Sequence, residues 1–149
     1  MAISIPDLKA LNFGYLSGAD LKQFCAAPIL IKIYETDNDA LQSGCNIAYA
    51  ELSSNLSNRY NIANELALTS GRNLLCVKIA TILAIHNILG DSYSSEITAN
   101  NYGDAKKDLI AIRNGQLALS LKLPETSEGE ISPSYSDAQM IKSNFQTLG

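Results

Sequence analysis

The residues with the clearest chemical potential are one histidine and three cysteines. His86 is the only histidine of the chain, and histidine is the side chain best suited to acid-base catalysis near neutral pH. However, Cys25, Cys45 and Cys76 are widely spaced, form no Cys-x-x-Cys pair, and have no second histidine as a partner. We therefore place His86 on the more exposed edge of a helix. We interpret the cysteines as buried, reduced thiols. The sequence predicts no catalytic, cofactor-binding or metal-ligating residue, and hence no enzyme.

Acidic side chains at positions 35, 37 and 39 resemble the start of a calcium-binding loop. Counting from Asp37, the sixth position is Gln42 where that loop needs glycine, and the twelfth is Ala48 where it needs a bidentate glutamate. The calcium interpretation therefore fails. One of residues 37–39 is better suited to be the N-cap of the helix that follows, because an acidic group there complements the helix dipole.

Composition and net charge narrow the possible classes of protein further. The 149 residues are 46% hydrophobic, enough for one domain with a core. The formal net charge of -4, without any basic run, disfavours a nucleic-acid-binding protein. The N-terminus lacks the pattern of a signal peptide, and the longest apolar run, residues 73–90, is shorter than the ~20 residues that span a bilayer. We expect assembly in a cytoplasm and no membrane partner.

Three long helices should form the core, which gives a mainly α fold built as a small helical bundle. The apolar run predicts a central helix over residues 72–89, with Ser70 near its start and Gly90 at its end. Apolar residues at steps of three and four predict an amphipathic helix over residues 39–60. The apolar face of that helix consists of Leu41, Cys45, Ala48, Leu52, Leu56 and Tyr60.

The third helix is predicted over residues 102–114. Asn114 and Gly115 should end it, since glycine tolerates the left-handed conformation common at helix ends. The core is expected to end at Gly115, and alternating leucines over residues 116–123 predict an extended segment that leaves the bundle.

The N-terminal part has two short helix candidates and one open assignment. Pro6 fits the first turn of a helix, and Ser17 fits a capping position. Residues 27–35 alternate weakly and suit either a short strand or an extended connection.

The tail forms the second part of the chain. Residues 124–137 are rich in Pro, Ser, Gly and acid, as in a flexible linker. Apolar residues then return at Met140, Ile141, Phe145 and Leu148, which fit one face of a short helix. They predict either a disordered end or an arm that docks on a neighbouring molecule.

Three segments in this order resemble a known family. They are "LSNRY" (residues 56–60), "LLCVKIATILAIHNILG" (74–90) and "NYGDAKKDLIAIRNGQLAL" (101–119). Together they resemble the small Mu-like phage proteins placed among head-tail connectors, also called adaptor or head-completion proteins. The pattern residues in this chain are Arg59, Tyr60, Tyr102, Ala105, Leu109, Ile112, Gly115 and Leu119. The chain departs from the family pattern at Asn58, Asn61 and Asp108, where glycine, proline and an aromatic residue are usual.

The resemblance implies a structural protein of the virion, located at the head-tail interface. Such a protein is expected to form a ring of about twelve copies beneath the portal, with DNA only as passing cargo. Its partners would be further copies of itself, the portal protein, and a neck, head-closure or tail-terminator protein. Residues 1–121 would form the helical connector domain, and residues 122–149 the flexible linker and docking arm. The alternative is a cytoplasmic helical adaptor or regulatory protein without enzymatic activity.

Overall fold

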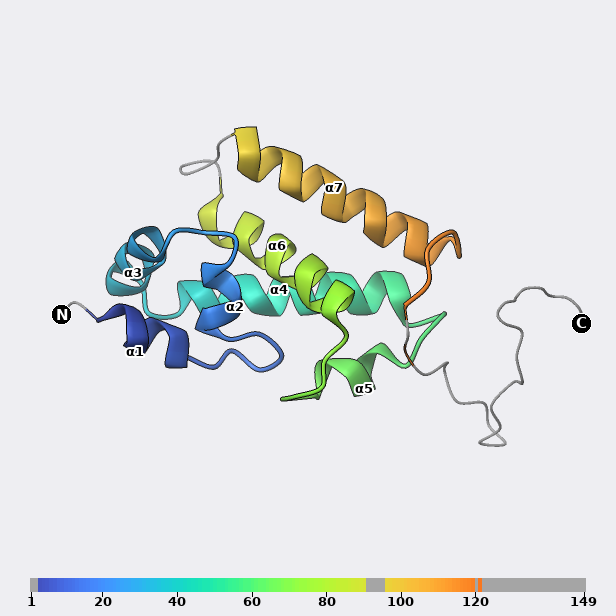
Figure 1. Cartoon of the computed structure of the whole chain (residues 1–149), viewed down its shortest axis with the longest axis horizontal. Coiled ribbons are helices and arrows are strands. Elements are labelled where there is room, and N and C mark those ends of the chain that lie inside the picture. Colours follow the sequence, from blue (N-terminus) through green and yellow to red (C-terminus); the bar gives the residue numbers. More distant parts are fainter. Residues whose placement is uncertain (1–2, 91–95, 120, 122–149) are drawn as a thin grey trace, which may run out of the picture.

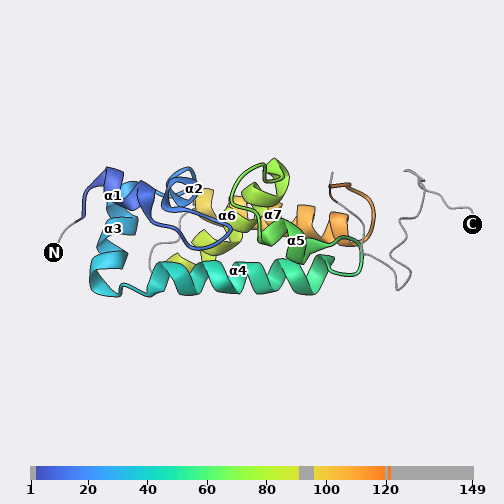
Figure 2. The same cartoon turned by 90° about the horizontal axis from the view of Figure 1, so that it is seen from below.

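The computed structural model describes residues 3–90, 96–119 and 121, and these residues form seven α-helices and no β-strand. Three helices are long: α4 (Ala40–Leu56), α6 (Leu74–Leu89) and α7 (Glu96–Arg113). Helix α4 lies along one side of the molecule and contacts both α6 and α7 (Figures 1 and 2). The prediction of a mainly α bundle is therefore confirmed.

Four short helices surround this core. Helices α1 (Ile5–Ala10), α2 (Gly18–Lys22) and α3 (Ala27–Thr36) gather near the start of α4, and α5 (Ile62–Leu66) lies near its end (Figure 2). Pro6 occupies the first turn of α1, as predicted. The Ser17 side chain accepts a hydrogen bond from the Asp20 backbone N–H and caps α2, also as predicted.

Residues 27–35 form neither of the structures considered for them, because they belong to α3. Pro28 is in the first turn, where its fixed φ and missing N–H are tolerated. Ala27 and Leu30 are buried one turn apart, and the helix packs against α1 and α4. Tertiary packing thus overrides the low helix propensity of the isoleucine-rich run.

The ends of two long helices also differ from the prediction. Helix α4 ends at Leu56, although Tyr60 is still buried as expected. Helix α6 begins at Leu74 and is capped by Asn73, whose side chain accepts the Cys76 backbone N–H at 2.9 Å. Ser70 does not cap it, because Gly71, with φ of 64°, has a conformation outside the helical region. Gly90 ends α6 with φ of 58°, as predicted.

The sequence does not predict helix α5 or the first turns of helix α7. Helix α5 has only five residues, too few to show an apolar period, and residues 96–101 at the start of α7 are mostly polar. Helix α5 is instead fixed by Asn61, whose side chain accepts the Asn64 backbone N–H at 3.2 Å, and by burial of Ile62 and Glu65. At the start of α4, Asp39 is the N-cap residue, but its side chain makes no capping hydrogen bond.

The two central helices, α4 and α6, come close together at Gly44 of α4. A Cβ atom at Gly44 would lie 2.3 Å from Ile88 Cγ1 and 3.2 Å from the Ala84 carbonyl oxygen. Both partners belong to α6, so the absence of a side chain is what allows α4 and α6 to pack this closely.

Candidate functional site

The three cysteines are free and buried. Burial raises the pKa of the Cys25 thiol to about 11, of Cys45 to about 12, and of Cys76 to about 11. These thiols are therefore un-ionised at neutral pH, and they pack as small apolar side chains. Their predicted burial is confirmed.

His86 lies half-buried between α6 and α7. Its ring stacks on Tyr102 with the centroids 3.6 Å apart and an angle of 12° between the ring planes. In the described part of the chain, no group of three or more His, Cys, Asp or Glu side chains is arranged to hold a metal ion. The position of His86 gives it a packing role between the two helices.

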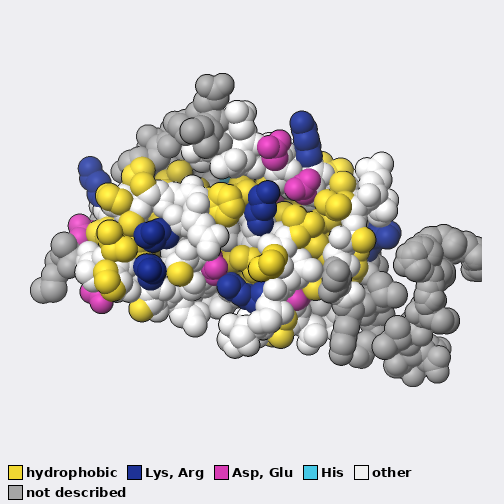
Figure 3. All heavy atoms as spheres, in the orientation of Figure 1, with side chains coloured by type: hydrophobic (Ala, Val, Ile, Leu, Met, Phe, Trp, Pro, Cys, Tyr) yellow, Lys and Arg dark blue, Asp and Glu magenta, His cyan; other side chains and the backbone are white. Residues whose placement is uncertain are grey.

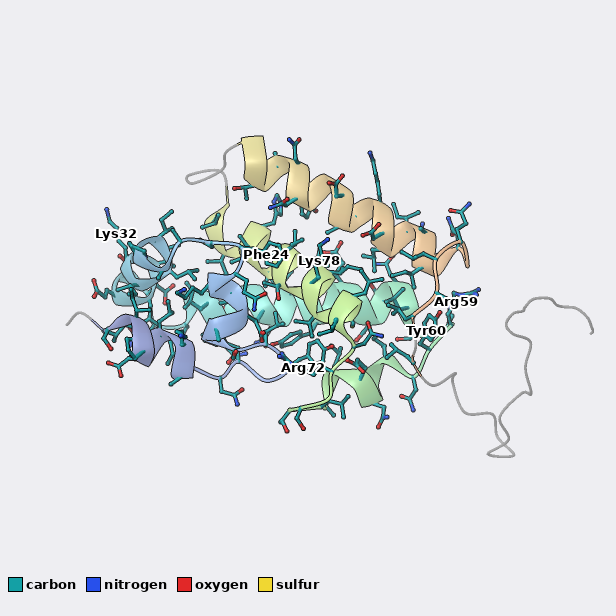
Figure 4. All side chains as sticks on the ribbon, in the orientation of Figure 1. Phe24, Lys32, Arg59, Tyr60, Arg72 and Lys78 are labelled. Atoms are coloured by element: carbon teal, nitrogen blue, oxygen red, sulfur yellow. The ribbon has the colours of Figure 1, made fainter. Side chains whose placement is uncertain are left out.

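Four of the eight residues of the connector pattern come together at the end of the bundle. The Tyr60 hydroxyl accepts a hydrogen bond from the Leu119 backbone N–H at 3.0 Å, although 59 residues separate them. The Arg59 guanidinium lies over Gly115, with its Nη2 2.9 Å from where a Cβ would stand. We call these four residues, Arg59, Tyr60, Gly115 and Leu119, the exit corner; Figure 4 shows Arg59 and Tyr60 at the end of the bundle where α7 ends. The other pattern residues hold α7 on the core: Ala105, Leu109 and Ile112 are buried, and Tyr102 is half-buried.

Gly115 makes the exit corner possible. Its φ is 81°, and its N–H donates to the Ile112 carbonyl oxygen at 3.1 Å. The Gln116 N–H donates to the Ala111 carbonyl oxygen at 2.8 Å. This pair of bonds is the Schellman motif that ends many helices on glycine, as the sequence predicts.

The core does not end at Gly115, however. Leu119 is buried, and Leu117 and Leu121 are packed partly buried against the core. The segment after α7 forms no strand among its described residues. The alternating leucines at 117, 119 and 121 therefore pack on the bundle, because burying them removes apolar surface from water.

A second constellation lies at the start of α6, and its residues were not identified as a site from the sequence. Arg72 donates to Asp20 through Nη1 at 2.7 Å and through Nη2 at 3.2 Å, and its Nη1 also donates to the Tyr15 carbonyl oxygen at 2.7 Å. Burial disfavours the charged form of Asp20, but hydrogen bonds from Arg72 and Ser17 outweigh it and lower the pKa of Asp20. The hydrogen bond with Asp20 in turn raises the pKa of Arg72.

Glu65 extends this constellation to α5. Its buried carboxylate accepts the Tyr15 hydroxyl and, at 2.7 Å, the Asn73 backbone N–H. Burial and the hydrogen bond to Glu65 raise the pKa of Tyr15, so its hydroxyl stays protonated and donates. We call Tyr15, Asp20, Glu65, Arg72 and Asn73 the polar network; it ties the N-terminal helices to the start of α6.

A pocket of about 560 Å³ lies beside the polar network, between α2 and α6. We call it the α2/α6 groove, and Phe24, Arg72 and Lys78 lie near it in the middle of the molecule (Figure 4). Figure 3 shows apolar and basic side chains exposed on the same face. The α2/α6 groove is lined by Asp20, Gln23, Phe24, Thr69, Ser70, Gly71, Arg72, Leu74, Val77, Lys78 and Thr81.

The sequence gives little signal for the network or the groove. Asp20 and Arg72 are 52 residues apart, and Tyr15 and Glu65 are 50 apart, so only the fold brings them together. The one local hint is the spacing of Ser17 and Asp20, which is that of a capping box. The arm residues Met140, Ile141, Phe145 and Leu148 lie outside the described residues.

Comparisons with protein-family models, curated proteins and solved structures found no match to this chain. Among the described residues, no helix is both long enough and apolar enough to cross a membrane.

Proposed function

We propose that this chain is a structural head-tail connector subunit of a phage or prophage. In this role about twelve copies form a ring beneath the portal and join the DNA-filled head to a neck, head-closure or tail-terminator protein. The subunit is assembled in the host cytoplasm and becomes part of the virion at the head-tail interface. The role needs binding surfaces and no catalysis.

The exit corner is the observation that carries this proposal. Its residues come from two separate segments of the connector pattern, and they contact each other through the Tyr60-Leu119 hydrogen bond and the Arg59-Gly115 contact. Amphipathic helices match one another easily in sequence. A chance match between such helices would not require Arg59 and Tyr60 to contact Gly115 and Leu119. The pattern therefore corresponds to one physical unit, and this unit holds the segment after α7 on the bundle.

The acidic character of the chain also suits this role. With a net charge of -4, a ring of such subunits would not hold strongly to phosphate groups, and DNA could pass through it.

Inactivation of the gene in the phage or prophage that encodes it tests the proposal. Electron microscopy of the particles should show DNA-filled heads and free tails that do not join, and the wild-type gene supplied in trans should restore joined particles. Normal yields of joined particles from the inactivated phage would contradict the proposal. A chain that stays monomeric or dimeric and binds a host protein would favour the helical adaptor instead.

A further inference from the structure

We propose that the α2/α6 groove receives residues 140–148 of a second copy of this chain. The inference rests on the proposed function, since it names the contact by which one connector subunit would hold the next. It assigns the groove as the receiving surface and the apolar C-terminal residues as the inserted segment.

The groove has an uncovered apolar side chain in the first turn of α6. Leu74 is 84% exposed, against 53% for Ile47, the next most exposed large hydrophobic residue of the described chain. Phe24 and Val77 line the same groove and are half-buried. An apolar segment seated here would remove all three side chains from water.

The walls of the groove are held in place before any partner arrives. Arg72 is fixed by its hydrogen bonds to Asp20 and the Tyr15 carbonyl oxygen, and the Thr81 hydroxyl donates to the Val77 carbonyl oxygen at 2.7 Å. A preformed surface loses little conformational entropy when it binds.

The charge of the groove fits the acidic linker. Asp20 is paired with Arg72, whereas Lys78 is exposed and pairs with no carboxylate of the described residues. Residues 124–137 contain Glu125, Glu128, Glu130 and Asp137 and no Lys or Arg. When Met140 and Phe145 are seated in the groove, the acidic linker approaches Lys78, and opposite charges attract.

The length of the arm allows it to reach another subunit. Eighteen residues (122–139) separate Leu121 from Met140, which gives a reach of about 60 Å when fully extended. Helix α4, with 17 residues, is only about 25 Å long. In a closed ring every copy offers one arm and one groove, so this single contact repeats around the ring.

Peptide binding tests the groove directly. A fluorescent peptide of residues 124–149, which contains the acidic linker and the apolar segment, is titrated into the full-length Met140→Asp/Phe145→Asp protein, whose own arm is disabled, and anisotropy is measured. We expect saturable binding that weakens at least tenfold when Leu74→Asp is added. Addition of Lys78→Glu should also weaken it and reduce its salt dependence. Aspartate in the first turn of α6 suits the helix dipole, so Leu74→Asp should not unfold the protein, and a thermal melt checks this.

Ile47→Asp is the matched control, because Ile47 is exposed and lies outside the groove lining. Its addition should leave peptide binding unchanged. Absence of peptide binding, or equal weakening by Leu74→Asp and Ile47→Asp, would overturn the inference.

Mixing two defective full-length proteins distinguishes a second copy from the chain's own arm. Leu74→Asp protein keeps its arm, and Met140→Asp/Phe145→Asp protein keeps its groove, so the mixture should form a dimer of one copy of each by light scattering. Peptide binding without a mixed dimer would mean that the arm docks on its own groove, and this would overturn the second-copy assignment.

The groove inference and the proposed function can fail independently of each other. If Leu74→Asp subunits complete phage necks at the wild-type yield, the groove inference is wrong while the connector function stands. If mixed dimers form but loss of the gene does not impair head-tail joining, the groove contact stands and the connector function is wrong.

Discussion

At the scale of single residues, the ion pair between Asp20 and Arg72 attaches α2 to the start of α6. Replacement of Asp20 by Asn should lower the free energy of unfolding at neutral pH by about 2 kcal/mol, the usual size for hydrogen bonds to charged groups. Because the pKa of Asp20 is lowered in the folded protein, its contribution is present above the ordinary carboxyl pKa and is lost as the pH falls through the lowered value. Urea unfolding should therefore show the difference between wild type and Asp20→Asn shrinking as the pH falls below the ordinary carboxyl pKa of about 4.

The same pair provides its own control. In an Arg72→Met background, Asp20→Asn should have a much smaller effect on the free energy of unfolding, since the two side chains share one interaction. Equal effects of Asp20→Asn in both backgrounds would mean that Asp20 acts only as a helix cap through Ser17.

Gly115 is the residue on which the exit corner depends. Its φ of 81° is unfavourable for residues with a Cβ, so Gly115→Ala should destabilise the protein by about 1–2 kcal/mol. The neighbouring Arg59 guanidinium is the end of a flexible side chain and can move aside, so Arg59→Ala should not rescue the variant. Chemical denaturation measures both, and a Gly115→Ala protein as stable as wild type would show that the strain is absent.

At the scale of helices, two glycines in helical conformation should respond in opposite directions to alanine. A Cβ at Gly44 would meet Ile88 of α6 at 2.3 Å, whereas one at Gly103 of α7 would meet nothing within 4 Å. Overpacking typically costs about 1–3 kcal/mol, while alanine in an open helical site gains about 0.5–1 kcal/mol. Thermal melts should therefore show a lower Tm for Gly44→Ala and a higher Tm for Gly103→Ala.

Ile88→Ala completes this comparison of helices. It removes the side-chain atom nearest to Gly44, so Gly44→Ala should cost less stability in that background. If both glycine variants raise the Tm, then the close packing of α4 on α6 is not what excludes a side chain at Gly44.

The sequence predicts the long helices because their apolar spacing records which face is buried. Leu41, Cys45, Ala48 and Leu52 are all buried on α4, as their spacing requires. Apolar spacing fails to predict α3, where packing overrides local propensity, and α5, which has only five residues. It predicts part of the exit corner, since Gly115 is a local stop signal and the remaining residues come from the connector pattern.

The polar network and the groove were beyond the reach of sequence patterns. Asp20 meets Arg72 and Tyr15 meets Glu65 only in the folded chain, because 52 and 50 residues separate the members of the two pairs. Periodicity reports the burial of one segment at a time, and it carries no information on which distant segments become neighbours.

At the scale of the whole molecule, the described helices form one bundle around a shared core. Removal of the chain after Leu123 should leave the free energy of unfolding of the bundle nearly unchanged, because the described core residues all precede that point. Urea unfolding of the shortened and full-length proteins tests this. A large loss of stability would show that the arm is part of the core of its own subunit.

The most direct test of the central claim is to count the copies of this chain that bind to the portal protein of the same phage. Native mass spectrometry of the full-length protein mixed with purified portal should show about twelve copies per portal ring. Met140→Asp/Phe145→Asp protein should bind in far fewer copies or remain free, because charge at apolar anchor positions opposes docking. A wild-type protein that stays monomeric beside its portal would contradict the account, whereas an arm variant that assembles as completely as wild type would contradict only the docking role of the arm.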